Sequence, residues 1–261
     1  MKIPIYQIDA FTSTVFKGNP AAVCPLASWL EDRVLQAIAL ENNLSETAFL
    51  VDQDDHYRIR WFTPEVEVDL CGHATLAAAY VVFHFIKPGT TSVRFLSKSG
   101  PLNVTEREQL VCLDFPVMEA SPCPPSDTLL RALGKNPREV LAARDYLVVY
   151  ENEDAIRNIQ PDFALLKQLD RMGVIITSPG VTADFVSRFF APKAGIPEDP
   201  VTGSAHCTLT PYWAKRLHKN SLVARQVSAR GGELFCEYQG QRVIIAGQAV
   251  CYLEGCIHIE P

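Results

Sequence analysis

The chain has 261 residues, of which 48% are hydrophobic and 21% are charged, a composition typical of a globular protein with one or two domains. Lys and Arg number 24 against 30 Asp and Glu, which gives a net charge of −6 and excludes the basic surface that nucleic-acid binding requires. The longest nearly apolar stretch, Leu76 to Ile86, is shorter than the ~20 residues of a membrane-spanning helix. We therefore expect no nucleic-acid partner and no membrane partner.

The N-terminus and the cysteines indicate the cellular compartment. Residues 1–9 alternate apolar and polar side chains, as a first strand does, and lack the continuous apolar core of a signal peptide. The eight cysteines include no Cys-x-x-Cys pair, so their spacing matches neither a disulfide scaffold nor a zinc site. We expect a cytoplasmic protein with reduced thiols and no metal.

The first half of the chain alternates between helix and strand patterns. Ser28 begins a Ser-Trp-Leu-Glu capping box, which predicts a helix that starts there and ends at Asn42-Asn43. Residues 75–85 are apolar on nearly every side and rich in alanine, which predicts a helix that is buried all round. Short strands are predicted around these helices, at residues 47–51, 57–62, 93–96, 102–104 and 110–115.

A proline-rich segment separates the two halves. Four prolines fall between Pro116 and Pro125, and such a segment suits an extended connector better than a helix or a central strand. We place the boundary there, with an N-terminal domain of residues 1–116 and a C-terminal domain of residues 117–261. The second domain is predicted to contain helices at residues 126–133 and 163–168 and strands at 146–150, 173–177, near 227, and at 233–238, 242–246 and 250–253.

The two halves share one local pattern. Phe62-Thr-Pro leads through an acidic stretch to Gly72-His73 at the start of an apolar helix, and Phe190-Ala-Pro leads in the same way to Gly203-Ser204. A matched pattern of this length predicts two similar domains.

Gly72 and Gly203 are candidate ligand-binding positions. Each precedes a predicted helix, whose start offers unpaired amides and about half of an elementary positive charge. A glycine there lets a ligand approach the backbone closely. These helix starts are therefore suited to binding a carboxylate. The alternative is that both glycines only form tight turns.

Three ionisable residues accompany these helix starts. His73 follows Gly72, where the positive potential disfavours the imidazolium, so we expect a neutral ring that moves a proton or merely caps the helix. Asp199 precedes Gly203 and is either a site carboxylate or a partner of the helix dipole worth ~0.3–1 kcal/mol. Glu46 precedes an apolar strand, where partial burial would suit a general acid or base, and its alternative is a solvated charge at a strand end.

Five motifs, spread over nearly the whole chain, carry a resemblance to a known family. They are Gly18-Asn-Pro-Ala-Ala-Val23, Asn42-Asn-Leu-Ser-Glu-Thr-Ala-Phe49, Arg60-Trp-Phe-Thr-Pro64, Leu70-Cys-Gly-His-Ala-Thr75 and Glu198-Asp-Pro-Val-Thr-Gly-Ser204. In this order they resemble the phenazine-biosynthesis isomerase (PhzF-like) family. The resemblance implies the diaminopimelate-epimerase-like fold, an α+β architecture of two similar domains, each a β barrel around a central helix, with the active site in the cleft between them. It also implies a homodimer.

The resemblance assigns roles to individual residues. Glu46 matches the family's catalytic general acid/base. His73, Asp199 and Ser204 match the polar residues around the transferred proton. The residues that match substrate contacts are Asn19, Gly72 and Gly203.

Related epimerases and racemases of this fold use two opposed thiols, one from each domain. Here Cys71 precedes Gly72, but the second-domain counterpart, Pro200-Val-Thr-Gly203, contains no thiol. This disfavours a two-cysteine mechanism and predicts that Cys71 is a buried bystander.

The sequence therefore predicts a cofactor-independent isomerase that acts on a small carboxylated substrate. One carboxyl group can take a proton from one carbon of a conjugated substrate and return it to another. Because no nucleotide-binding glycine fingerprint or phosphate loop is present, we expect no cofactor. Two alternatives stay open: an amino-acid-type epimerase that uses Glu46 and Asp199 on opposite faces of one stereocentre, and a non-catalytic binding protein on the same fold.

Overall fold

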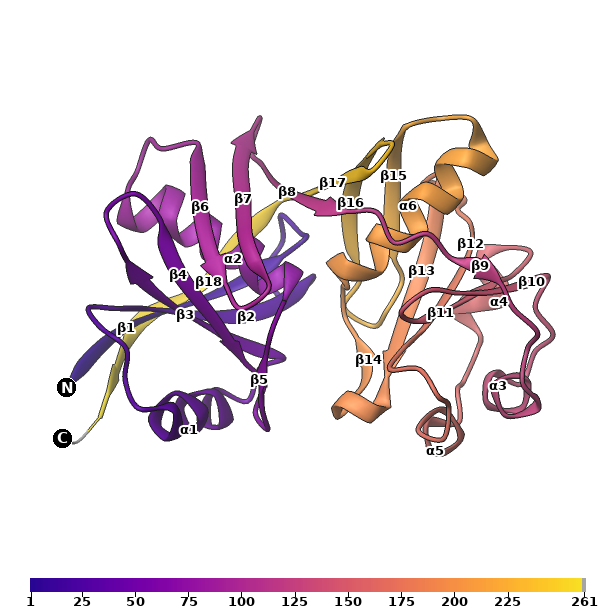
Figure 1. The fold of residues 1–261 in the computed structure, drawn as a ribbon, viewed down its shortest axis with the longest axis horizontal. Coiled ribbons are helices and arrows are strands. Elements are labelled where there is room, and N and C mark those ends of the chain that lie inside the picture. Colours follow the sequence, from indigo (N-terminus) through magenta and orange to yellow (C-terminus); the bar gives the residue numbers. More distant parts are fainter. Residues whose placement is uncertain (260–261) are drawn as a thin grey trace. The chain divides into compact units, whose positions relative to one another are not determined.

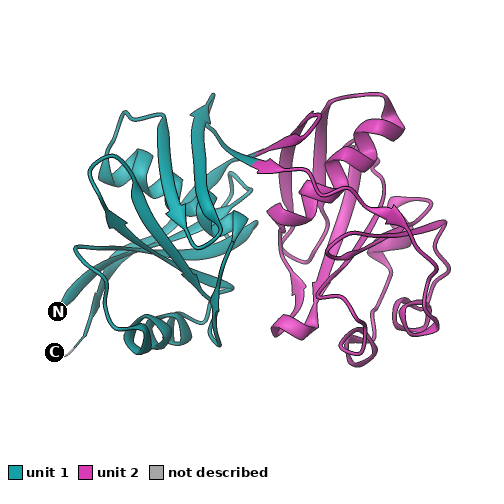
Figure 2. Ribbon diagram, viewed as in Figure 1, with its two compact units in different colours: residues 1–114, 246–261 teal, residues 115–245 magenta. Residues whose placement is uncertain are grey.

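The computed structural model describes residues 1–259 and divides the chain into two compact units (Figure 1, Figure 2). Unit 1 contains residues 1–114 together with the chain from Ala246 onward, and unit 2 contains residues 115–245. None of the described helices is both long and apolar enough to span a membrane.

Unit 1 combines strands with two main helices. Its elements are β1 (Lys2–Ala10), β2 (Asn19–Leu26), α1 (Asp32–Asn42), β3 (Glu46–Asp52), β4 (Tyr57–Phe62), β5 (Glu67–Val68), α2 (Gly72–Val81), the π-helical turn η1 (Val82–Ile86), β6 (Ser92–Ser97), β7 (Gly100–Arg107), most of β8 (Leu110–Pro116) and β18 (Ala249–His258).

Unit 2 is built in the same way from the middle of the chain. Its elements are β9 (Ser121–Pro122), α3 (Asp127–Leu133), β10 (Glu139–Ala142), β11 (Tyr146–Val149), α4 (Glu153–Arg157), α5 (Phe163–Leu166), β12 (Val174–Pro179), β13 (Phe185–Ala191), the 3-10 turn η2 (Pro192–Ala194), β14 (Ile196–Asp199), α6 (Gly203–Leu217), β15 (Ser221–Gln226), β16 (Gly232–Gln239) and most of β17 (Arg242–Gly247).

The two units repeat one strand topology. In unit 1, β2 pairs in parallel with β3, β3 with β4 and β4 with β5 pair antiparallel, and β4 also pairs in parallel with β6. In unit 2, β11, β12, β13, β14 and β15 show the same sequence of parallel and antiparallel pairings. Helices α2 and α6 therefore occupy equivalent places in the two units, and the predicted duplication is confirmed.

Helix α2 is a core helix without a polar face. All its residues except Tyr80 are buried, and it packs against β1, β2 and β3 within the surrounding sheet (Figure 1). This explains why its sequence lacks the alternation of polar and apolar faces that a surface helix shows. The prediction of a buried helix over residues 75–85 is confirmed as far as Val81, whereas the next residues form the π-helical turn η1, in which His84 is exposed.

Each unit holds the segment before its core helix with the same ion pair. In unit 1, Arg60 on β4 donates from Nε and Nη2 to the two carboxylate oxygens of Glu67 on β5, both at 2.8 Å. In unit 2, Arg188 on β13 makes the same two bonds to Glu198 on β14, at 2.7 and 2.9 Å. Each guanidinium also lies over the phenylalanine ring two positions later in its own strand, 5.0 Å from the centroid in β4 and 4.9 Å in β13. We call these pairs the arginine–glutamate clamps.

The structure corrects the predicted start of the first helix. The helix begins at Asp32, after an extended Glu31, and Ser28 does not cap it. The reason is tertiary, because Trp29 and Leu30 pack as part of the preceding segment against the hydrophobic cluster of unit 1. The predicted helix end is confirmed, since Asn43 adopts a left-handed conformation with a φ of 49°.

The predicted extent of the C-terminal domain also needs correction. Its range of 117–261 includes β18, but β18 pairs antiparallel with β1 from Lys2↔His258 to Ala10↔Ala249. The last strand is therefore part of unit 1. The division nearest to the proline-rich segment falls between Asp114 and Phe115.

Candidate active site

Three predicted residues of unit 1 meet at the start of α2. Glu46 is the first residue of β3, Asn19 the first of β2, and His73 the second of α2. Because β2 and β3 are paired in parallel, with Ala21 opposite Glu46, their first residues lie at the same edge of the sheet. Helix α2 packs on both strands, so its start brings His73 to this edge.

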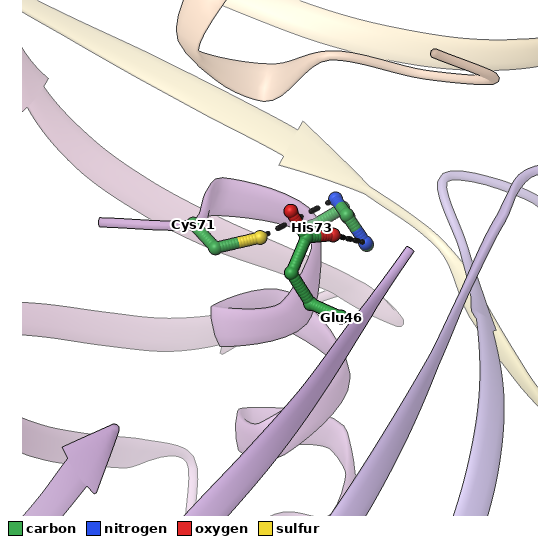
Figure 3. A group of neighbouring side chains, drawn as sticks. All are labelled: Glu46, Cys71 and His73. Carbon is green, nitrogen blue, oxygen red and sulfur yellow. Dashed lines mark hydrogen bonds and ion pairs between the residues drawn. The ribbon is translucent and has the colours of Figure 1, made fainter. Parts of the chain in front are cut away.

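His73 contacts a different neighbour through each side of its ring (Figure 3). Its Nε2 lies 3.1 Å from Oε2 of Glu46. Its Nδ1 lies 3.5 Å from Sγ of Cys71 and 3.2 Å from the side-chain amide nitrogen of Asn19. All four residues are buried, with exposed fractions of at most 8%. The expectation that Glu46 is a solvated strand-end charge is thus excluded.

The side chains that face His73 determine the direction of its pKa shift. Burial alone would lower the pKa of His73, but the facing Cys71 and Glu46 outweigh it and raise that pKa well above 6.5. Burial raises the pKa of the Cys71 thiol to about 11, so this thiol is neutral near pH 7 and Glu46 supplies the stabilising negative charge. The predicted neutral His73 is therefore wrong. A full charge at 3.1 Å outweighs the half charge of a helix start.

His206 on α6 shows what happens without such a carboxylate. Its ring is fully buried, and Nδ1 lies 2.9 Å from the carbonyl oxygen of Thr202. Burial lowers the pKa of His206 to about 4, so the ring is neutral and Nδ1–H donates to that oxygen. The two core helices thus carry one charged and one neutral histidine.

The contact between Glu46 and His73 is compatible with more than one protonation state. Their facing atoms are within ion-pair distance, but neither atom forms an aligned hydrogen bond with any described residue. The amide of Asn19 can present its nitrogen to an unprotonated Nδ1 or, after a half-turn, its oxygen to a protonated one. The site can therefore accommodate both charge states of the ring.

The predicted residues of unit 2 gather around the start of α6. Asp199 ends β14, is buried, and accepts a 2.5 Å hydrogen bond from the hydroxyl of Thr202. Gln226, at the end of β15, accepts from the Thr202 amide at 2.9 Å and donates to the Asp199 carbonyl at 2.7 Å. Ser204, the second residue of α6, accepts from Arg144 at 3.1 Å.

Both predicted helix starts are present, since Gly72 and Gly203 are the first residues of α2 and α6. The structure thus places Asn19, Glu46, Gly72 and His73 together in unit 1. It places Asp199, Gly203 and Ser204 together in unit 2. Carboxylate binding by the two helix starts stays a prediction.

Sequence reasoning missed four residues of these two groups. Cys71 is buried as predicted, and its contact with His73 was not foreseen. Thr202 stands directly before Gly203, and threonine is a residue type that often caps helices. The sequence could therefore have indicated this residue. Gln226 and Arg144 carry no local signal, because their contacts join segments far apart in the chain.

One group of metal-ligating side chains comes together among the described residues. A carboxylate oxygen of Glu46, the sulfur of Cys71 and a ring nitrogen of His73 all lie within 4.8 Å of one another. The adjacent His206 and Cys207 on α6 belong to no such group within residues 1–259.

The chain is similar to proteins of one family over nearly its whole length. The profile of the family described as phenazine biosynthesis-like protein matches residues 8–255. An uncharacterized isomerase from Pseudomonas aeruginosa is 52% identical over 259 residues, which cover 99% of this chain and 100% of that protein. A crystal structure of a PhzF-family phenazine biosynthesis protein from Enterococcus faecalis has 50% identity and a TM-score of 0.97, covering 99% of this chain and 100% of that one.

More distant structures are similar in fold alone. A hydroxyproline epimerase from Agrobacterium vitis is 10% identical, with a TM-score of 0.66 over 98% of this chain and 92% of that one. Together with the two matched units, these likenesses confirm the expected α+β, diaminopimelate-epimerase-like fold.

Proposed function

The chain belongs to the phenazine biosynthesis-like protein family, and on that premise we propose that it is an isomerase. It moves a proton between two carbon atoms of a small carboxylated substrate, with Glu46 as the general acid and base and without a cofactor. The observation that carries this proposal is the buried contact between Glu46 and a charged His73.

The charge on His73 suits Glu46 to both halves of the reaction. While Glu46 is ionised, the facing imidazolium stabilises it in a buried site, so a base is ready to take a proton from carbon. The electron pair left behind spreads over the conjugated substrate. Once Glu46 is protonated, its carboxyl group is the acid of the second half. Glu46 then returns the proton to a different carbon, so the net reaction is an isomerisation.

The start of α2 and the group around Asp199 complete the proposal. Within unit 1, the backbone amides at Gly72 hold the substrate carboxylate, as helix starts hold anions. Within unit 2, Gly203 offers the same kind of helix start, with Asp199 and Ser204 as its polar side chains. Asn19 is fully buried and bonded to His73, so we assign it to positioning the ring rather than to the substrate contact that the resemblance implies.

Replacing Glu46 with glutamine tests the assignment. The amide matches the carboxyl group in size but cannot relay a proton, so Glu46→Gln should lower kcat by ~10²–10⁴-fold or more while substrate still binds. The matched control is Glu41→Gln, which changes an exposed glutamate on α1 of the same unit. Wild-type turnover in Glu46→Gln would refute the role of this carboxylate.

Deuterated water separates isomerase from epimerase. A panel of small carboxylic acids, including a dihydro-hydroxyanthranilate and amino acids, is incubated with the protein and analysed by NMR and mass spectrometry. Transfer by one carboxyl group predicts a rearranged double bond with little or partial deuterium, because the proton can return before it exchanges. Full deuterium at one inverted centre of an unchanged skeleton would favour the epimerase that uses Glu46 and Asp199. Binding without any reaction would favour the non-catalytic alternative.

A further inference from the structure

We propose that Glu46, Cys71 and His73 form a binding site for Zn²⁺ or a cation of the same class, and that the cation switches the isomerase off by taking the place of the transferable proton. The inhibitory part rests on the proposed function of Glu46, whereas the binding part does not. The inference starts from the donor set. A thiol, an imidazole and a carboxylate are the three ligand types that zinc sites in proteins use.

The spacing of two of the donors, Cys71 and His73, matches one tetrahedral ion, and the third donor lies nearby. Ligand atoms held ~2.0–2.3 Å from zinc at the tetrahedral angle lie roughly 3.3–3.6 Å apart. Here Sγ of Cys71 lies 3.5 Å from Nδ1 of His73, and a single choice of donor atoms from the three residues falls within 4.8 Å. A cation bound between Sγ and Nδ1 replaces the Asn19 contact at that nitrogen, and the side chain of Glu46, which faces Nε2 at 3.1 Å in this structure, turns toward the cation to complete the site.

The burial and the charges of the three side chains favour binding of a cation. Oε2 of Glu46 and Nε2 of His73 are buried and face each other at 3.1 Å, and neither atom forms an aligned hydrogen bond to any described residue. Coordination releases the thiol proton of Cys71 and one ring proton of His73 to solvent, and the cation takes over their positive charge beside Glu46. Three protein ligands leave a fourth position open for water or for an anionic ligand.

The proposed switch follows from competition for the same atoms. An oxygen of Glu46 that coordinates a divalent cation no longer has the basicity to take a proton from carbon. Bound zinc and proton transfer therefore exclude each other at this site.

The binding test uses cobalt as a visible substitute for zinc. The reduced, metal-stripped full-length protein is titrated with Co²⁺, and we expect a thiolate-to-cobalt charge-transfer band with the intense visible bands of tetrahedral cobalt, both lost when Zn²⁺ is added. Cys71→Ser should abolish the charge-transfer band. It should also weaken Zn²⁺ binding beyond the ~10–100-fold that loss of an outer partner of a metal ligand costs. The matched control is Cys256→Ser, which removes an exposed thiol and should change nothing.

Each outcome decides one part of the inference. A band that persists in Cys71→Ser, or a wild-type protein without specific Co²⁺ and Zn²⁺ binding, overturns the site. If Cys71→Ser does not fold, His73→Gln serves in its place and should remove the tetrahedral bands. Zinc that binds at these residues but leaves turnover unchanged overturns the switch. These spectra need no substrate, so a failure of the proposed isomerase activity is recognised separately, by the Glu46→Gln assay.

Discussion

The charge of one buried ring depends on one carboxylate. His73 and His206 both lie in the first turns of core helices and both are fully enclosed by protein, yet the pKa of His73 is raised and that of His206 is lowered to about 4. Burial acts on both rings in the same direction. The difference comes from the groups that face His73, of which Glu46 at 3.1 Å carries the charge.

This difference predicts the behaviour of His73 when the carboxylate is removed. In Glu46→Gln, burial remains while the negative charge is gone, so the pKa of His73 should fall below 6.5. NMR titration of the ring protons measures this directly, and His206 in the same spectra is the internal reference that should not move. The control Glu41→Gln should leave both values unchanged. An unaltered His73 titration in Glu46→Gln would show that another group holds the charge.

Residue identity at this site was predictable, but its charge state was not. Glu46, His73 and Asn19 were named from motifs that the sequence shows directly. The ionisation of His73 follows from the approach of Glu46, which arises from the parallel pairing of β2 with β3 and the packing of α2 on both. The helix-start argument considered only the local backbone and therefore gave the wrong sign.

At the scale of elements, the arginine–glutamate clamps fix the short strands that lead into α2 and α6. Both use two parallel bonds between a guanidinium and a carboxylate, the geometry that lysine cannot reproduce. The repeated pattern was recognised from Phe62 and Phe190 onward. Arg60 was named as part of a family motif, but Arg188, which stands at the same place before Phe190, was not. Their partners became visible only when β5 and β14 paired back onto β4 and β13.

The clamp of unit 1 predicts a specific dependence of stability on pH. The hydrogen bonds from Arg60 hold the pKa of Glu67 at about 2, below its ordinary value of 4.5. A lowered carboxyl pKa stabilises the fold fully above pH 4.5, and this contribution is lost as the pH falls from 4.5 toward 2. Glu67→Gln should therefore lower the free energy of unfolding by about 1 kcal/mol at pH 7, and the difference from wild type should shrink across that interval.

Urea unfolding at a series of pH values measures this effect. The matched control is Glu65→Gln, an exposed glutamate in the same loop, which should not show the same convergence with the wild type. A constant difference between Glu67→Gln and wild type from pH 7 to pH 2 would contradict the assignment.

At the scale of the whole molecule, the chain passes twice between the units. The first passage follows β8 and was predicted from the proline-rich segment that begins at Pro116. The second passage, from β17 to β18, was not predicted, because only Gln248 separates the two strands and the composition does not change there. Which unit receives a strand depends on its pairing partner, and the partner of β18 is β1 at the other end of the chain.

Removal of the last strand tests this connectivity. A chain that ends at Ile245 leaves β1 paired with β2 alone and exposes its other edge. In a chain of this size each kcal/mol of lost stability lowers the Tm by about 2–4 °C, so we expect the Tm of unit 1 to fall by at least ~5 °C and the protein to aggregate on heating. Light scattering during a thermal scan measures both. A chain lacking only residues 260–261 is the control, and an unchanged Tm in the longer truncation would contradict the role of β18.

The pairing of the first strand with the last also bears on how the protein is made. Along the chain β1 is synthesised before unit 2 and β18 after it, whereas domains synthesised first ordinarily finish folding first. Here unit 2 can complete its fold first, since residues 115–245 are all synthesised before β18, which unit 1 still lacks. Until β18 has been synthesised, the outer edge of β1 stays open to other nascent chains, so the time needed to translate unit 2 sets how long this protein is exposed to misassembly.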